Sequence, residues 1–312
     1  HARRMSEDEP GADLHYTIAL VAMSANRPIE SLAAADVLLR GSANRPAKAS
    51  YLTVQASALH LLGRYEEELA VAERCAAFFP DEPYCRAVEA RALVALGRVE
   101  ELLALTEQVL TSAVQAESTV MTVAASPGDV LVVASRELRA HGHPEASVGV
   151  AQRLVRWHRS TTGASKEERN RLELGTALTL AGQWQEAEAI FAELAALPID
   201  PDPEDDWHRY WNMVYTGNRG ELAARQGHRR DALAIAARLE GMDQSLFRGE
   251  PLIWSAAIAA QLGERERALD LLRRALGSGA YALTPAGGVH DEPGLEPLWG
   301  DPEFVELLRP KG

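Results

Sequence analysis

The sequence has few of the features that mark membrane, secreted or nucleic-acid-binding proteins. No apolar run approaches the roughly 18 residues that a membrane helix needs, and the opening HARRMSEDEP is not followed by the apolar stretch of a signal peptide. Basic residues number 32 against 45 acidic ones, which gives a net charge of −13. Such a chain offers no broadly basic face for phosphates, so we expect no nucleic-acid partner and no insertion into a membrane.

Cysteine is nearly absent. Cys75 and Cys85 lie ten residues apart without a second pair, which is too few for a disulfide framework and lacks the pattern of a zinc site. We therefore expect buried free thiols. Free thiols and the lack of a signal peptide favour a cytoplasmic location.

Catalytic motifs are also missing. The sequence contains no HExxH, no P-loop and no G-x-S-x-G. The G-x-G at Gly277 to Gly279 follows a helical pattern where a nucleotide site needs a strand. The acidic run from Asp200 to Asp206 resembles a calcium loop in charge, but it has two prolines and no glycine, which favours a linker and a helix cap. We expect no enzyme activity, no cofactor and no metal.

What the sequence does contain is alanine, helix-forming periodicity and internal repeats. Similar segments such as LLGRYEEELAVAERC and LAGQWQEAEAIFAEL recur, and the spacing between their glycines ranges from 34 to 45 residues. Seven units are visible, anchored at Asn26, Gly63, Gly97, Gly142, Gly182, Gly227 and Gly263. Each unit reads as helix, turn and helix, with the anchor where the first helix ends, because glycine and asparagine tolerate a positive φ.

Two further positions share this register. Seven residues before each anchor stands a small residue, as close helix packing requires: Ala19, Ala56, Ala90, Ser135, Gly175, Gly220 and Ala256. Twelve residues after each anchor stands an apolar residue, which marks the buried stripe of the second helix: Leu38, Cys75, Val109, Leu154, Leu194, Leu239 and Ala275. Glu68 breaks a third pattern, since Ala187, Ala232 and Ala268 occupy the matching position five residues after later anchors. Helix caps are expected at Asp129 and Asp301.

The pattern resembles the tetratricopeptide repeat family. The closest unit, from Leu172 to Pro201, carries the Leu174-Gly175 pair, Gly182, Trp184, Ala187 and Phe191. The resemblance implies an all-α, right-handed α-solenoid of about seven helix pairs, with a scaffold function. We expect a flexible N-terminal tail over residues 1–12, the solenoid over 13–276, and an extended segment with a capping helix over 277–312.

The C-terminal tail is similar to the segment that closes tetratricopeptide regions in bacterial signalling proteins, particularly serine/threonine kinases and transcriptional regulators. The matching residues are Asp291, Pro293, Leu295, Pro297, Leu298, Asp301, Pro302, Phe304, Leu307 and Leu308. Together with Trp299, the apolar ones could cover the open end of the solenoid. The resemblance also implies that an effector domain precedes this chain in a longer protein.

The concave groove is the expected binding site of such a fold, and two sets of residues are candidates. The inferred register places a partly cationic set on the groove: Tyr84, Arg91, Arg136, Arg139, Arg169, Thr176, Glu221 and Arg225. Guanidinium groups bind carboxylates in a bidentate way, so an acidic peptide or protein is the expected partner, unless these arginines pair with neighbours such as Glu89, Glu137 and Glu173. Trp207, Tyr210 and Trp211 form either an aromatic wall for a ligand or internal packing.

These observations favour a non-catalytic module that binds a peptide or protein in its groove, as the regulatory part of a bacterial signalling protein. The alternative is a small-molecule sensor that controls an attached kinase or transcription-factor domain. A specific thermal stabilisation by a metabolite would distinguish the second function from the first.

Overall fold

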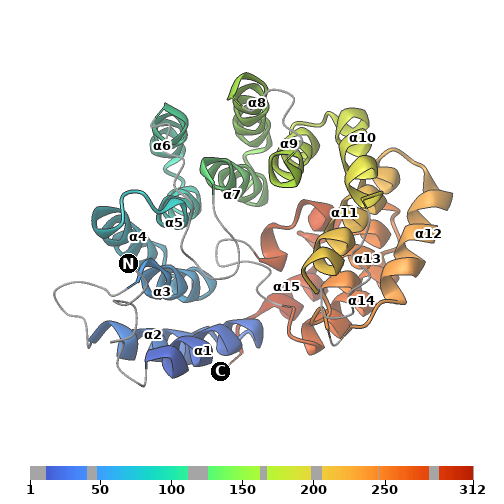
Figure 1. The fold of residues 1–312 in the computed structure, drawn as a ribbon. Helices are drawn as coiled ribbons and strands as arrows, with labels where there is room; N and C mark the ends of the chain where they lie inside the picture. The colour runs from blue at the N-terminus through green and yellow to red at the C-terminus, as the bar shows by residue number, and fades with distance from the viewer. Residues whose placement is uncertain are drawn as a thin grey trace. The chain divides into compact units, whose positions relative to one another are not determined.

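The computed structural model describes residues 12–40, 48–111, 126–161, 167–197, 206–244, 246–280 and 288–311. Every regular element in these ranges is a helix (Figure 1). No helix among the described residues is both long and apolar enough to cross a membrane. The N-terminal tail and most of the acidic run from Asp200 fall outside the described residues, so the expectations made for them are not addressed.

The helices follow one another in pairs. The bounds of the first eight are α1 Ala12–Ser24, α2 Pro28–Arg40, α3 Ala49–Leu61, α4 Tyr65–Phe78, α5 Pro83–Ala95, α6 Val99–Thr111, α7 Pro127–Ala140 and α8 Pro144–Thr161. The next six are α9 Glu168–Leu180, α10 Trp184–Ala195, α11 Asp206–Arg225, α12 Arg229–Glu240, α13 Glu250–Gln261 and α14 Arg265–Gly277. Two short 3₁₀ helices, η1 Val289–Asp291 and η2 Pro293–Leu298, precede α15 Pro302–Leu308.

The repeat register predicted from the sequence is confirmed at the turns. Six anchor glycines have φ between 68° and 82°, and the asparagine that replaces the first one, Asn26, has φ 56°. Each anchor lies between the first and second helix of a pair, where the left-handed conformation ends one helix and starts the next. The described residues therefore form seven helix pairs of the tetratricopeptide-like kind, and the predicted all-α helical-repeat class is confirmed.

The small residues before the anchors are buried, as predicted. Five of the seven positions carry a Cβ or larger side chain with 0% exposure. At Gly220 on α11 there is no room for one, because an added Cβ would lie 2.4 Å from Cδ1 of Ile258 and 2.7 Å from Cγ2 of Ile235. At Gly220 the neighbouring helices therefore approach too closely for a side chain.

The chain divides into two compact units. The first comprises residues 1–130, 284–286 and 309–312, and the second comprises residues 131–283 and 287–308. The core of the first includes Leu38, Tyr51, Leu52 and Cys75. The second unit has one core between α11, α12 and α13, and another in which η2 and α15 pack on α13 and α14. The second core includes Leu295, Leu298 and Phe304, with Trp299, Leu307 and Leu308 packed against it.

The expectation of free thiols was wrong. Cys75 and Cys85 form a disulfide with a Cα–Cα distance of 5.3 Å. Cys75 ends the buried stripe of α4 and Cys85 lies in the first turn of α5, so the tight turn between the helices brings the two sulfurs together. The free-thiol argument for a cytoplasmic location therefore no longer holds.

Of the two expected caps, one is confirmed and one is shifted. Asp301 Oδ1 accepts hydrogen bonds from the backbone N–H groups of Glu303 (2.8 Å) and Phe304 (3.4 Å) at the start of α15. The helix expected to begin after Asp129 begins earlier, because Ser126 caps α7. Asp129 occupies the third helical position and bonds back to the Ser126 N–H at 2.7 Å, which forms a capping box.

A candidate peptide-binding groove in the second unit

Predicted groove residues from two helices meet around the C-terminal segment of the same chain. Arg136 and Arg139 lie one turn apart on α7, and Glu221 and Arg225 lie one turn apart on α11. Residues 288–298, which contain η1 and η2, lie against these side chains and against α13 (Figure 1). We call residues 288–298 the groove segment.

Charged side chains join the groove segment to α7. Arg136 Nη2 donates to Glu292 Oε2 at 2.9 Å and to Asp291 Oδ1 at 3.2 Å. Arg139 Nη1 donates to Glu296 Oε2 at 3.0 Å. The pairs differ in their solvent exposure, since the side chains of Asp291 and Glu292 are 0% and 7% exposed whereas that of Glu296 is 38% exposed. The first two acids are therefore bound in a largely dry site.

Backbone carbonyls of the groove segment are bound by side-chain donors. Arg225 Nη2 donates to the carbonyl oxygen of Pro293 at 2.6 Å, and Gln261 Nε2, at the end of α13, donates to that of Gly294 at 2.9 Å. Arg136 Nε adds a weaker bond of 3.3 Å to the carbonyl of Asp291. The groove segment is 3₁₀-helical rather than extended, and these side-chain donors satisfy carbonyls that its short helices leave over, as buried backbone groups require.

The apolar part of the groove segment packs closely on the helices. Leu295 and Leu298 are 0% and 3% exposed. Gly294 lies so close that a Cβ on it would stand 2.5 Å from Cβ of Ala257 on α13 and 2.9 Å from Oε2 of Glu221 on α11. The groove therefore accepts glycine, and no larger residue, at this position.

The electrostatics of the groove are dominated by acids. Burial alone would lower the pKa of Arg136, but Asp291, Glu292, Glu137 and Glu221 surround it and raise that pKa well above its usual value. Glu221 is also paired with Arg225, whose Nε donates to its Oε1 at 2.8 Å, so two guanidiniums face these four carboxylates. Accordingly, burial raises the pKa of Glu292, and Glu221 and Asp291 raise it further, while Arg136 opposes the change.

A histidine of the groove segment adds a contact with α7. His290 Nε2 lies 3.2 Å from Glu137 Oε1, and His141 Nε2 lies 3.5 Å from the other oxygen of the same carboxylate. Glu137 itself is 0% exposed. This buried acid therefore lies between two imidazoles, one from its own helix and one from the groove segment.

The predicted groove residues of the first unit are internal. Arg91 is buried and donates to Glu68 Oε1 at 2.7 Å and to Ser57 Oγ at 3.3 Å. Glu68 Oε2 lies 2.8 Å from His60 Nδ1. Tyr84 is also buried, on α5. The guanidinium of Arg91 is thus part of a buried network inside the first unit.

The other candidates of the second unit, Arg169 and Thr176, belong to α9. Arg169 pairs with Glu173 at 2.9 Å on the same helix, as the alternative interpretation expected, and Thr176 is half-buried. Glu173 also faces the buried His158 at 3.4 Å. Burial would raise the pKa of Glu173, but hydrogen bonds from His158 and Arg169 lower it below its usual value.

The predicted aromatic wall is largely part of a core. Tyr210 and Trp211 pack against the cluster between α11, α12 and α13. Tyr210 donates to Glu250 Oε1 at 3.2 Å, and Trp211 stacks on Tyr215 at 6.3 Å between ring centroids. Trp207 belongs to α11, but its side chain lies outside the described residues. The packing of these rings explains the aromatic cluster of the sequence.

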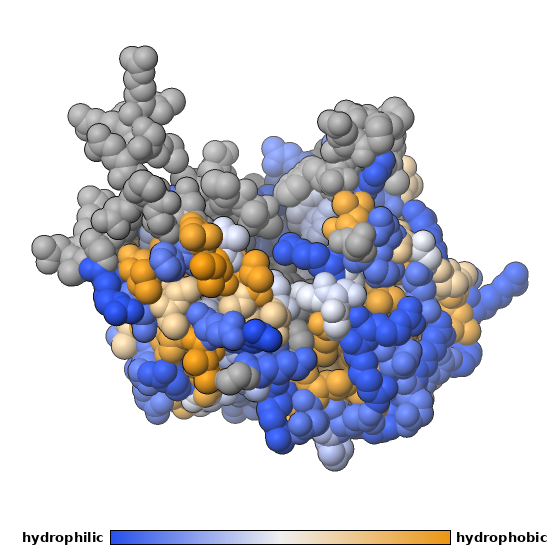
Figure 2. Space-filling model, turned by 90° about the horizontal axis from the view of Figure 1, so that it is seen from below, coloured by the Kyte–Doolittle hydropathy of each residue, from blue (hydrophilic) through white to orange (hydrophobic). Residues whose placement is uncertain are grey.

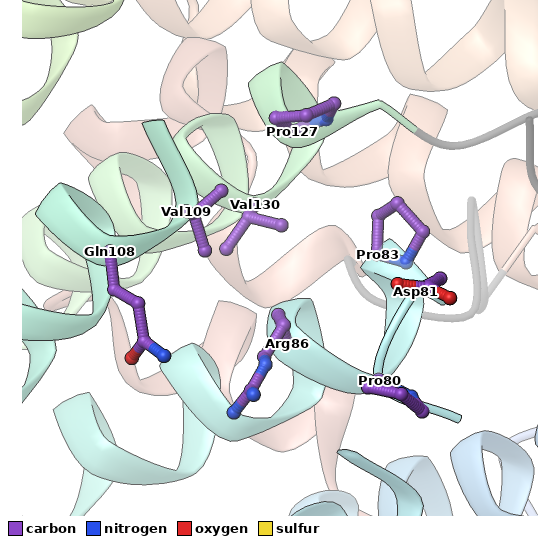
Figure 3. Close-up of a pocket in the computed structure, with 8 residues that line it drawn as sticks. All are labelled: Pro80, Asp81, Pro83, Arg86, Gln108, Val109, Pro127 and Val130. Carbon is purple, nitrogen blue, oxygen red and sulfur yellow. The ribbon is translucent and has the colours of Figure 1, made fainter. Parts of the chain in front are cut away.

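The first unit contains a separate pocket of about 190 Å³ near the starts of α5 and α7 and the end of α6 (Figure 3). Val109 and Val130 lie next to each other on one side of it, and Arg86 lies opposite. The remaining lining residues are Pro80, Asp81, Pro83, Gln108 and Pro127. Arg86 is itself paired with Glu89 at 2.7 Å. The pocket is therefore small and mainly apolar.

Sequence reasoning missed what occupies the groove. Asp291, Glu292 and Glu296 were expected to belong to a closing segment, and their pairing with Arg136 and Arg139 was not foreseen. The opposite charges of the two segments were a usable signal, since the tail carries four acids between Asp291 and Asp301 and no base.

The fold and the groove define the chain as a helical-repeat protein whose second unit packs its own acidic segment, residues 288–298, against α7, α11 and α13. No family model matches the sequence, and no curated protein matches it. A tetratricopeptide repeat protein from Parabacteroides merdae is 14% identical, with a TM-score of 0.44 over 87% of this chain and 94% of that one.

Two further solved structures have lower scores. They are the Naa15/Naa10 complex bound to HypK-THB, at 14% identity and a TM-score of 0.32, and the APC/C hetero-tetramer Cut9–Hcn1, at 11% and 0.30. They match 85% and 87% of this chain, and 37% and 52% of their own. The fold described above rests on the helix pairs of this chain itself.

Proposed function

We propose that this chain is a non-catalytic protein-interaction module whose second unit recognises a short acidic segment. The observation that supports this function is the groove segment, a short acidic stretch bound through both side chains and backbone. Arg136 and Arg139 donate hydrogen bonds to its carboxylates. Arg225 and Gln261 donate to its carbonyl oxygens, and its leucines are buried against the helices. This combination gives affinity through the backbone and specificity through alternate side chains.

In this arrangement the chain's own segment occupies the groove. A partner that carries the same pattern, acid-acid-Pro-Gly-Leu-acid, has to compete with a segment held at high effective concentration by its covalent linkage. The groove segment therefore shows what a ligand would look like, and it also competes with that ligand for the groove. An experiment on this function has to weaken the internal segment without changing the groove.

Gly294 provides that change. Gly294→Ala places a Cβ against Ala257 and Glu221 and so expels the groove segment. A fluorescently labelled peptide of the sequence GVHDEPGLEPL keeps the glycine that corresponds to Gly294, so it still fits the groove. We expect it to bind the full-length Gly294→Ala variant at least about tenfold more tightly than the unchanged protein, by fluorescence anisotropy, because the competitor has been removed.

Gly300→Ala is the matched control, because nothing lies within 4 Å of a Cβ at that position. It should bind the peptide like the unchanged protein. Two control peptides should not bind the unchanged protein or the Gly294→Ala variant. One has alanine in place of the glycine that corresponds to Gly294, and the other has lysine in place of its acids. Equal binding of all three peptides, or no binding to a folded Gly294→Ala variant, would refute the proposed groove.

Circular dichroism establishes that the variant is folded. If Gly294→Ala loses helix content, Glu296→Lys replaces it as a milder variant. Glu296 lies at the exposed edge of the groove segment and faces Arg139, so a lysine there repels the guanidinium while the buried contacts remain.

We also propose that the module is the regulatory part of a bacterial signalling protein and is preceded by an effector domain. The closing pattern of the tail, from Asp291 to Leu308, supports this. An immunoblot of source cells tests it by size. A band much larger than 33.9 kDa is expected, and a band near that mass would contradict the proposal.

The alternative, a small-molecule sensor, has the pocket of the first unit as its site. Its 190 Å³ is below the roughly 300–1,000 Å³ of pockets that enclose drug-sized ligands. A thermal-shift screen of metabolites distinguishes the two functions. A specific stabilisation that Val109→Trp abolishes would favour the sensor.

A further inference from the structure

The first helix pair exposes an unusual amount of apolar surface. Among the described residues, nine large hydrophobic side chains are exposed, and six of them lie on α1 and α2: Leu14, Ile18, Leu20, Val21, Ile29 and Val37. Leu14 and Val21 are 61% and 62% exposed. Figure 2, a view from below Figure 1, shows hydrophobic residues gathered on the left, on the same side as α1 and α2.

Helix α1 has large apolar side chains on its exposed face as well as on its buried face. Its inner face buries Ala19, Ala22 and Met23, while its outer face shows Leu14, Ile18 and Val21 to solvent. A helix that is hydrophobic all round is usually covered on all sides. The outer face of α1 is thus an interface that lacks its second side, and contiguous exposed patches of this kind mark interaction sites.

Between Leu14 and Val21, none of the exposed side chains of α1 is ionisable. From Leu14 to Val21 its exposed residues are Leu14, Thr17, Ile18, Leu20 and Val21, and His15 beside them is half-buried. The chain as a whole has a charge of −13, so two copies repel each other over most of their surfaces. On this strip they can approach without placing like charges opposite one another.

The spacing of the strip suits a helix packed against a copy of itself. Leu14, Ile18 and Val21 follow intervals of four and three residues, the spacing of a helix–helix seam. If two copies of α1 run antiparallel about a twofold axis between Thr17 and Ile18, Leu14 of one lies opposite Val21 of the other and the two Ile18 side chains lie next to the axis. Isologous contacts of this kind are the commonest in homo-oligomers.

We propose that the outer face of α1 and α2 joins two copies of this chain in a symmetric dimer, with α1 packed against α1 and Ile18 at its centre. Ile29 and Val37 of α2 extend the contact on either side. Two helices of 13 residues, each about 20 Å long and about 10 Å wide, offer a face of about 400 Å² in projection. Two such faces bury about 800 Å² in total, which is below the range of stable interfaces, so the dimer we propose is weak and reversible.

The first test is sedimentation velocity of the full chain from about 1 to about 100 μM, the range of a reversible dimer. The unchanged protein should shift from monomer to dimer over this range. Val21→Glu should raise the dimer Kd at least about tenfold, because two carboxylates then face an apolar seam. Val305→Glu is the matched control, since Val305 is 54% exposed on α15 and the same substitution there should leave the Kd unchanged.

A crosslinking experiment tests the register. Ile18→Cys places one new thiol next to the twofold axis, where it lies close to its own copy, and mild oxidation should link two chains. Val305→Cys should form no covalent dimer under the same conditions. A protein that is monomeric at every concentration, or a dimer that Val21→Glu does not weaken, overturns the proposal. Equal crosslinking of the two cysteine variants overturns it as well.

Discussion

Glu68 occupies a position where three later repeats carry alanine, and it is 0% exposed. Its two oxygens bond to Arg91 Nε at 2.7 Å and His60 Nδ1 at 2.8 Å, so the buried carboxylate is satisfied on both sides. A buried charge is tolerated only with such partners. Glu68 is therefore an exception to the alanine pattern that His60 and Arg91, from the two neighbouring helices, make possible by binding its carboxylate.

The first prediction follows from this network. Glu68→Ala should lower the free energy of unfolding by about 3–5 kcal/mol, because it leaves the guanidinium of Arg91 buried without its carboxylate. Urea unfolding followed by circular dichroism measures the change. Glu67→Ala is the control, since Glu67 pairs with Arg64 on the exposed surface and its loss should leave the unfolding midpoint nearly unchanged.

Glu250 predicts a pH dependence. Burial, together with Glu292, raises its pKa from 4.5 to about 7, although Tyr210 and Arg248 oppose the shift. The folded protein therefore holds this proton more tightly than the unfolded chain. Stability from Glu250 is fully present below pH 4.5 and is lost as the pH rises through 7.

Glutamine cannot ionise, so Glu250→Gln should be more stable than the unchanged protein at pH 8, by about 2 kcal/mol, and equal to it near pH 4.5. Unfolding midpoints at the two pH values measure the difference. Glu145→Gln, at an exposed position of α8, should show no such change with pH. If the stability difference between the Glu250→Gln variant and the unchanged protein is the same at both pH values, Glu250 is not a buried acid with a raised pKa.

At the scale of the elements, close helix contacts depend on small residues. Gly220→Ala in α11 should destabilise the protein by about 1–3 kcal/mol, because the new Cβ meets Ile258 and Ile235. Gly149→Ala in α8 makes the same chemical change where nothing lies within 4 Å. It should be neutral or stabilising by up to about 1 kcal/mol, since alanine favours helix. Thermal unfolding of both variants tests whether packing or propensity dominates.

The turn between α4 and α5 carries the disulfide. Reduction should lower the free energy of unfolding by about 2–3 kcal/mol, because a closed loop of ten residues no longer restricts the unfolded chain. The Cys75→Ala, Cys85→Ala double variant should not respond to reductant. Alkylation followed by mass spectrometry should find no free thiol before reduction and two after it, and two free thiols before reduction would contradict the bond.

Turn chemistry made the elements predictable. A positive φ at Asn26 and six glycines is a local property, so the sequence alone placed the break between the helices of each pair. The disulfide was missed because cysteine spacing does not report which side of a turn each thiol faces. The Asp129 cap was misplaced by a few residues because Ser126 is an equally good capping residue.

For the whole molecule, the far-ultraviolet circular dichroism spectrum should show mostly helix and little strand, as every regular element among the described residues is helical. A strong sheet signal would overturn the fold. The spectrum should keep this form in the Gly294→Ala and Val21→Glu variants, because neither residue lies inside a helix-pair contact that the fold depends on.

The candidate site was only partly predictable. Arg136, Arg139, Glu221 and Arg225 follow from the repeat register, which places them on the inner faces of the first helices. Their partners do not, because Asp291 and Glu292 are about 155 residues away in the chain. Arg91 and Arg169 share the register, yet they pair with Glu68 and Glu173.

The sequence by itself determined the helix pairs, their turns and the small contact residues, because each depends on intervals of a few residues and on the φ preferences of glycine and asparagine. Only the tertiary structure decided that the groove holds the chain's own acidic segment, that two cysteines are bonded, and that the outer face of α1 has no cover among the described residues. These depend on which side chains meet in space, and helical periodicity specifies a face of a helix without specifying what lies against it.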